Sequence, residues 1–246
     1  MTAEHILNEL HSVADTKKAR FLQGFFKTGP GEYAEGDLFL GIVTPLIRSI
    51  AKVNIKTPLH ELQTLITSEY HEARLCALLI AAARFKKAAE EERTLLFEFY
   101  LRNTRYANNW DLVDVAYPHV VGVYLLDKER SILYELAQST SLWEQRIAIV
   151  STVIFIRNNE FIDTLALSEQ LLSHPHDLIH KAVGWMLREV GKRDRETLTD
   201  FIERNSAKMS RTTLRYAIEH YPEDERQYFL RKDKKQRGSA NKPGTS

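Results

Sequence analysis

A tryptophan and an aspartate four residues apart are the strongest candidates for chemistry in this sequence. In the run Asn109-Trp-Asp-Leu-Val-Asp114, the asparagine is a favoured N-cap, so the run predicts a helix that begins at Trp110. Residues four apart share one helical face, which would place the Trp110 indole beside the Asp114 carboxylate. Asp111 suits the positive end of the helix dipole and is interpreted as structural. The pair is a candidate site, although an aspartate of this kind also fits an ordinary surface or interface position.

The elements that would position this pair are helices. Apolar residues recur at spacings of three and four along most of the chain, and convincing alternation of period two is absent. The dipeptides Thr44-Pro45 and Thr57-Pro58 predict two helix starts, each with the threonine as cap and the proline in the first turn. Residues 27–37 hold three glycines and predict a loop, which lacks the Gly-Lys-Ser/Thr ending of a phosphate-binding loop. Apolar spacing marks two helices near the N-terminus, and further helices are expected over 72–87, 90–101, 125–138, 141–156, 163–172, 174–191, 193–204, 210–220 and 222–230.

The helices are expected to pair into repeated hairpins. About a dozen helices joined by short connections, in pairs roughly 35–40 residues apart, are typical of helical repeat proteins. Residues 141–149 and 180–188 resemble two copies of one inner helix, each with a tryptophan and an arginine three residues apart. We therefore predict an all-α protein of HEAT-like helical hairpins that form a curved α-solenoid with a concave face. A compact helical bundle is the competing architecture.

Composition and charge limit the classes of protein that fit. The single Cys76 excludes a disulfide or a cysteine zinc site within the chain and is interpreted as a buried apolar residue. The N-terminus lacks an apolar signal core and no apolar run reaches membrane-spanning length, so a cytoplasmic protein without membrane contact is expected. Of 34 basic and 33 acidic residues, the last sixteen hold six basic and one acidic, which leaves 28 basic against 32 acidic in residues 1–230. We predict one domain over 1–230 and a basic, disordered tail over 231–246.

With an acidic body, nucleic-acid binding needs a concentrated basic face. Arginine suits bidentate phosphate contact, and the candidate basic residues together could follow a phosphate backbone. Each tryptophan also fits a packing role between repeats, which is the favoured interpretation of Trp143. The histidines lack metal-ligand spacing, and no serine or cysteine lies in a nucleophile motif, so neither a metal nor a cofactor is expected. The candidates on the predicted inner helices are Arg146, Lys181, Trp185 and Arg188. A basic rim could extend to Arg48, Lys52, Lys192, Arg211 and Arg215.

These residues also carry a resemblance. The chain resembles the AlkD family of DNA alkylation-repair glycosylases in five ordered stretches that run through most of residues 20–220. The two most specific are Trp110-Asp-Leu-Val-Asp114 and Lys181-Ala-Val-Gly-Trp-Met-Leu-Arg-Glu189. The other three are Phe39-Leu-Gly-Ile42 with Thr44-Pro45, Trp143-Glu-Gln-Arg-Ile-Ala148, and Ser210-Arg211.

The resemblance implies a HEAT-like repeat protein whose concave face holds duplex DNA and which hydrolyses the N-glycosidic bond of cationic alkylated purines. N3-methyladenine and N7-methylguanine are such bases. By motif, Asp114 would be the catalytic carboxylate, Trp110 its partner against the sugar, and Trp185 a second tryptophan of the cleft. Arg146 and Arg188 would hold the DNA backbone. The family recognises lesions through backbone and sugar, with little need for a base pocket.

Three functions are weighed. The first is a monomeric glycosylase acting on duplex DNA with alkylated bases, without metal or organic cofactor. The second is a non-catalytic protein that binds distorted or branched DNA with the same basic face. The third, a protein-interaction scaffold, predicts an exposed apolar groove and no salt-dependent DNA affinity. Arginine and lysine on the predicted inner helices disfavour the scaffold.

Overall fold

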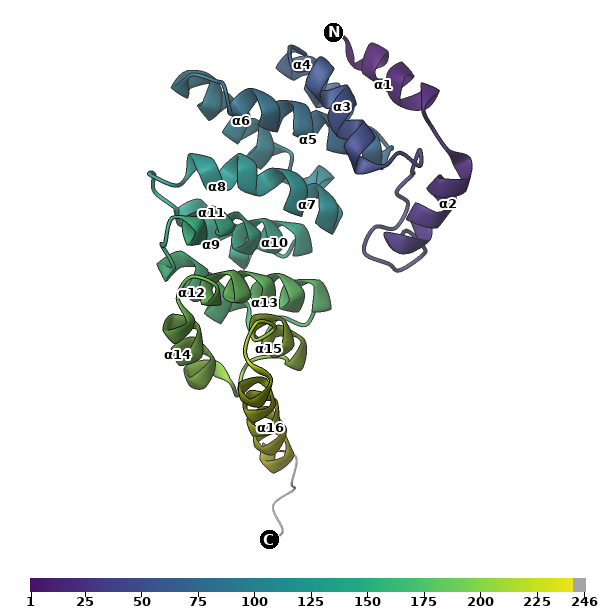
Figure 1. Ribbon diagram of the computed structural model, residues 1–246. Coiled ribbons are helices and arrows are strands. Elements are labelled where there is room, and N and C mark those ends of the chain that lie inside the picture. Colours follow the sequence, from purple (N-terminus) through teal and green to yellow (C-terminus); the bar gives the residue numbers. More distant parts are fainter. Residues whose placement is uncertain (241–246) are drawn as a thin grey trace. The chain divides into compact units, whose positions relative to one another are not determined.

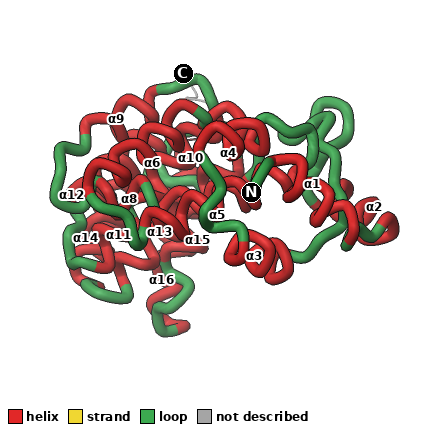
Figure 2. The backbone as a smooth tube through the Cα atoms, turned by 90° about the horizontal axis from the view of Figure 1, so that it is seen from above, coloured by secondary structure: helices red, strands yellow, loops and turns green. Residues whose placement is uncertain are grey.

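The computed structural model describes the backbone of residues 1–240 and the side chains of residues 1–231. Over these residues the chain is built of helices and loops, with one isolated bridge between Leu38 and Tyr70 in place of a sheet (Figure 2). The predicted all-α class is confirmed. The chain divides into two compact units, unit 1 (Met1–Lys128) and unit 2 (from Glu129). The curved solenoid, its concave face and the single domain over 1–230 stay predictions.

Unit 1 is organised around one buried helix. Helix α5 (His71–Phe85) buries every residue except Ala83 and Arg84, because its apolar side chains lie on all sides. It packs against α3, α4, α6 and α7, and Figure 1 shows these helices around it. The free Cys76 lies inside this helix, and its burial, together with the charge of Glu9, raises the pKa of its thiol to about 12. The other helices of unit 1 are α1 (Ala3–Ser12), α2 (Thr16–Phe25), α3 (Thr44–Val53), α4 (Leu59–Ile66), α6 (Glu90–Arg102), α7 (Trp110–Ala116) and α8 (Val121–Tyr124).

Unit 2 is organised around α13 (Asp177–Gly191), which packs against α10, α12, α14 and α15. The two segments predicted to be copies of one helix fall in α10 and α13, which lie side by side (Figure 1). Trp143 is 9% exposed, as its predicted packing role requires. The other helices of unit 2 are α9 (Ser131–Gln138), α10 (Leu142–Ser151), α11 (Val153–Arg157), α12 (Ile162–Leu171), α14 (Arg195–Asn205), α15 (Arg211–Ala217) and α16 (Glu223–Ala240).

Gly184 permits the close approach of α13 to α15. A Cβ atom at this position would lie 2.5 Å from the Cβ of Tyr216 and 2.7 Å from the carbonyl oxygen of Thr213. Gly184→Ala is therefore expected to lower the free energy of unfolding by about 1–3 kcal/mol through overpacking, measured by chemical denaturation. The matched control is Gly24→Ala in α2, where nothing lies within 4 Å of the added Cβ. That change is expected to be neutral or to stabilise the helix by up to about 1 kcal/mol, and equal losses in the two variants would contradict the packing argument.

Two predicted helix caps are wrong. Val43, and not Thr44, is the N-cap of α3, and Pro58 is the N-cap of α4; neither cap makes a side-chain hydrogen bond. Thr57 instead donates its hydroxyl to the carbonyl of Asn54. Both prolines still lie at the starts of their helices, where a missing N–H costs little.

One predicted helix is shorter than expected and another is divided. The helix expected over 125–138 begins at Ser131, after a charged turn in which Glu129 accepts the Ser131 N–H at 2.8 Å. The helix expected over 141–156 is divided at Thr152, whose hydroxyl bonds the carbonyl of Ile149 at 2.7 Å, into α10 and α11. In both places side-chain hydrogen bonds to the local backbone compete with the helix.

The C-terminal end differs from the predicted tail. The backbone of residues 231–240 is helical and belongs to α16, where a disordered tail was expected. This stretch has no proline, and its first glycine is Gly238, so its composition permits a helix. Residues 241–246 lie outside the described part of the chain. None of the described helices is long and apolar enough to cross a bilayer.

Candidate functional site

Helix α7 carries the candidate pair. Asn109 is its N-cap, as predicted, and its side-chain oxygen accepts the Trp110 N–H at 2.9 Å. Trp110 and Asp114 are both half-buried, one helical turn apart. The Trp110 ring packs against Phe25 and Phe26, with centroid separations of 6.1 and 5.3 Å. The helix therefore brings together an indole, a carboxylate and the aromatic side chains at the end of α2.

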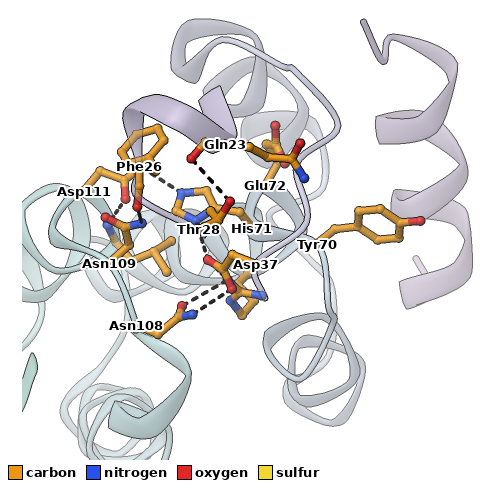
Figure 3. A network of polar contacts seen from close by, with 12 residues as sticks. Gln23, Phe26, Thr28, Asp37, Tyr70, His71, Glu72, Asn108, Asn109 and Asp111 are labelled. Atoms are coloured by element: carbon orange, nitrogen blue, oxygen red, sulfur yellow. Dashed lines mark hydrogen bonds and ion pairs between the residues drawn. The ribbon is translucent and has the colours of Figure 1, made fainter. Parts of the chain in front are cut away.

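A buried histidine is held between two carboxylates beside α7 (Figure 3). The Nε2 of His71 lies 2.8 Å from Asp111 Oδ2, and its Nδ1 lies 3.4 Å from Asp37 Oδ2. All three side chains are buried. The contact joins α5 to the first turn of α7, which supports the structural interpretation of Asp111.

Arg74 and Asn108 complete this network from the side of Asp37. Arg74 Nη2 donates to Asp37 Oδ2 at 2.7 Å, and Asn108 Nδ2 donates to Asp37 Oδ1 at 2.7 Å. Burial alone would raise the pKa of Asp37, but the hydrogen bond with His71 and the charge of Arg74 hold this pKa below its ordinary value. Asp37 is therefore a buried carboxylate kept ionised by its partners.

His71 is kept protonated by the same network. Burial by itself would lower the pKa of His71, but the charge and hydrogen bond of Asp111 and the hydrogen bond of Asp37 raise it above 6.5 despite the opposing charge of Arg74. The folded state therefore binds the His71 proton more tightly than the unfolded chain does.

This difference predicts a pH dependence of stability. Because the folded-state pKa of His71 is raised, its stabilising contribution is complete below 6.5 and declines as the pH rises through the folded-state value. We expect the free energy of unfolding of the wild type, minus that of His71→Gln, to decrease as the pH is raised above 6.5. The opposite effects of His174 and His176, whose pKa values are lowered by burial, cancel in this difference. A difference that stays flat from pH 6 to 9 would show that the bridge carries no charge.

Hydrogen bonds join residues 39–42, which we call the glycine segment, to α5 beside this network. The carboxylate of Glu72 accepts the backbone N–H groups of Leu40, Gly41 and Ile42 at 2.8–3.1 Å. Gly41 has a φ of 84°, and a Cβ there would lie 2.1 Å from the carbonyl oxygen of Asp15, so only glycine fits. The segment thereby holds Phe39 face to face with His71, at a centroid separation of 4.5 Å.

In unit 2 the predicted DNA contacts lie on α10, α13 and α15. Arg146 is 5% exposed and donates from Nη1 to the carbonyl of Leu178 at 2.6 Å, so it holds the start of α13. Lys181 pairs with Asp177 at 2.7 Å, and the half-buried Arg188 pairs with Glu219 on the turn after α15.

The remaining candidates differ in exposure. Arg211 is exposed at the start of α15, and Trp185 is half-buried on α13. In unit 1, Arg48 is exposed on α3. The two units each hold part of the candidate set, and its DNA contacts stay predictions.

Comparison with known proteins decides the family. A family model described as "DNA alkylation repair enzyme" matches residues 6–221, nearly the whole chain. The chain belongs to the DNA alkylation repair enzyme family. Among solved structures, it is similar to one titled "Predicted DNA alkylation repair enzyme from Enterococcus faecalis", with 16% identity and a TM-score of 0.67 over 85% of this chain and 97% of that one. At this identity the likeness shows a shared fold alone. Among curated proteins, none matches.

Membership of the DNA alkylation repair enzyme family gives this chain a role in the repair of alkylation damage. The sequence resemblance to that family is thereby confirmed. The motif Phe39-Leu-Gly-Ile42 now has a structural explanation, because Glu72 binds its backbone and Phe39 stacks on His71.

The buried network around His71 was not predicted from the sequence. Asp37 and His71 are 34 residues apart, and His71 and Asp111 are 40 apart, so no local spacing joins them. One signal was present, since a histidine, a glutamate and an arginine at positions 71, 72 and 74 interrupt the start of a strongly apolar helix. Among the described residues, no group of three or more His, Cys, Asp or Glu side chains is placed to hold a metal ion.

Proposed function

We propose that this protein is a DNA glycosylase that removes cationic alkylated purines, such as N3-methyladenine and N7-methylguanine, from duplex DNA. The observation that carries the proposal is the Trp110–Asp114 pair, half-buried and one turn apart on α7. Family membership supports a substrate of alkylated DNA. Asp114 is proposed as the catalytic carboxylate and Trp110 as its partner against the sugar.

Hydrolysis of the N-glycosidic bond of a cationic base requires few catalytic groups. Alkylation at N3 or N7 makes the base a cation, so the C1′–N bond can break with its electron pair moving to the base, which leaves without being protonated. An oxocarbenium-like sugar remains, which the negative charge of Asp114 stabilises. The same carboxylate positions a water molecule for attack on C1′ and accepts the proton that this water releases. One carboxylate suffices here, whereas most glycosidases need a second carboxyl group to protonate the oxygen of the leaving group.

The aromatic side chain adds to this effect. The face of an indole attracts a cation and excludes water, and both effects strengthen the interaction between Asp114 and a cationic sugar. Phe25 and Phe26 hold the Trp110 ring from the side of α2. The DNA backbone is proposed to contact Trp185, Lys181, Arg188 and Arg211 of unit 2 and Arg48 of unit 1. Arg146 is proposed to position α13 for these contacts, because it bonds the carbonyl of Leu178.

The test is base release from methylated duplex DNA. The wild-type protein is incubated with duplex DNA treated with a methylating agent, and released bases are separated and quantified by mass spectrometry. We expect N7-methylguanine and N3-methyladenine to be released and abasic sites to accumulate in equal amount. Salt-sensitive DNA binding without any release, and with a preference for branched DNA, would favour the non-catalytic alternative.

A further inference from the structure

We infer that His71 is a positioning residue of the proposed active site, because it fixes both the first turn of α7 and the ring that supports Trp110. The inference rests on the proposed glycosylase function. His71 is only 2% exposed, so its effect on a DNA substrate passes through the side chains that it holds.

The first connection is the hydrogen bond between His71 and Asp111. The Nε2 of His71 lies 2.8 Å from Asp111 Oδ2, while Asp111 Oδ1 accepts the Leu112 N–H at 2.9 Å. One carboxylate thus joins α5 to the backbone of α7. Asp111 directly follows Trp110 and lies three residues before Asp114, so any shift of this turn relative to α5 displaces both members of the candidate pair.

The second connection is a cluster of rings. The His71 ring lies against Phe26 and Phe39, with centroid separations of 5.3 and 4.5 Å. Phe26 in turn contacts the Trp110 ring at 5.3 Å. The N-cap residue Asn109 donates from Nδ2 to the carbonyl of Phe26 at 3.4 Å (Figure 3). The end of α2 and the start of α7 are therefore held together beside His71.

A cavity of about 350 Å³ borders this cluster, and its lining includes Phe21, Phe25, Phe26, Phe39 and His71. Side chains in a close-packed interior are held by neighbours on every side. On the side of the cavity these rings have fewer neighbours, so their contacts with His71 contribute more to holding them in one arrangement.

Stability alone explains the buried ionic groups poorly. Removing His71, Asp37 and Asp111 from water costs free energy, and apolar side chains of similar volume often stabilise a fold equally well. Catalysis is more demanding, because a misplacement of about 1 Å can lower a rate by about 100-fold. Holding α7 in one position against α5 accounts for the polar network at this place.

The test compares Asp111→Leu with Asp111→Asn. Leucine removes both hydrogen bonds of the side chain, whereas the amide of asparagine can still bond the His71 ring and the Leu112 N–H. We expect Asp111→Leu to lower the single-turnover rate of N7-methylguanine release by about 10–100-fold, with unchanged DNA affinity. Asp111→Asn is expected to keep most of the wild-type rate. Circular dichroism checks that each variant is folded at the assay temperature, where a loss of stability alone does not slow release.

A second variant, His71→Leu, tests whether the two residues act as a unit. The double variant is expected to be no slower than the slower single variant, because both changes remove the same interaction. The matched control is His60→Leu, the same change at an exposed histidine on α4, which is expected to release the base at the wild-type rate. If His71→Leu does not fold, the two Asp111 variants still decide. An Asp111→Leu rate equal to that of the wild type, or an equally slow Asp111→Asn, would overturn the positioning role.

A readout without activity separates this role from the proposed function. The protein has three tryptophans, and Trp143 and Trp185 lie in unit 2. In protein labelled with 5-fluorotryptophan, we expect Asp111→Leu to broaden or split the fluorine resonance of Trp110 alone, and Asp111→Asn to leave it a single line. That result without base release by the wild type rejects the glycosylase and keeps the positioning of Trp110. Release at equal rates by the wild type and Asp111→Leu, with a single Trp110 line in both, rejects the positioning role alone.

Discussion

Asp114→Asn is expected to lower the single-turnover rate of N7-methylguanine release from duplex DNA by about 10²–10³-fold, the effect of removing one preorganised electrostatic group. Asparagine keeps the shape of the side chain but removes the charge that stabilises an oxocarbenium-like sugar. DNA affinity is expected to stay equal or to increase slightly, since a negative charge facing a polyanion is lost. Rate and affinity are measured separately, by quenched-flow release and by fluorescence anisotropy.

The control for this variant is Asp127→Asn. Asp127 is an exposed carboxylate in the turn after α8, so the same chemical change is made in the same unit away from α7. It is expected to release the base at the wild-type rate. If Asp114→Asn also retained the wild-type rate, the catalytic role of Asp114 would be wrong.

Arg74→Met is expected to lower the free energy of unfolding by about 3–5 kcal/mol, because breaking a buried ion pair leaves a buried charge with fewer partners. Arg74 is 4% exposed and bonds Asp37, Asn108 and the carbonyl of Ser68. Methionine keeps most of the volume and removes the charge and all three hydrogen bonds. The loss is measured by denaturant unfolding followed by circular dichroism.

Arg193→Met provides the comparison for this prediction. Arg193 is exposed and makes a long hydrogen bond, 3.3 Å, to Asn159 on the surface of unit 2. Its replacement is expected to change the free energy of unfolding by about 0.5 kcal/mol or less. A similar small loss in Arg74→Met would mean that the network around Asp37 does not stabilise the fold.

Local rules predicted the parts of the structure that local interactions determine. The apolar spacing of residues 72–87 predicted α5, and the asparagine at 109 predicted the start of α7 with its side-chain cap. The same rules failed at Thr44 and Thr57, because Val43 and Pro58 take the cap positions and neither makes a side-chain hydrogen bond.

The buried part of the candidate site depends on contacts between residues far apart in the sequence, which local spacing does not predict. Phe21 and Phe25 mark a helix by their spacing, yet the pattern does not reveal that their faces stay exposed beside a cavity. The bridge from Asp37 through His71 to Asp111 joins a loop, α5 and α7, and only the fold brings these three together. Charge counting along the chain likewise does not show that Glu72 is buried and binds three backbone N–H groups.

The most direct test of the proposed function is a single-turnover measurement on a duplex that carries one N7-methylguanine, with protein in excess over DNA. We expect the wild-type protein to release the methylated base and to leave one abasic site per duplex. Full binding of this duplex by the wild type, with the methylated base still attached after many hours, would contradict it.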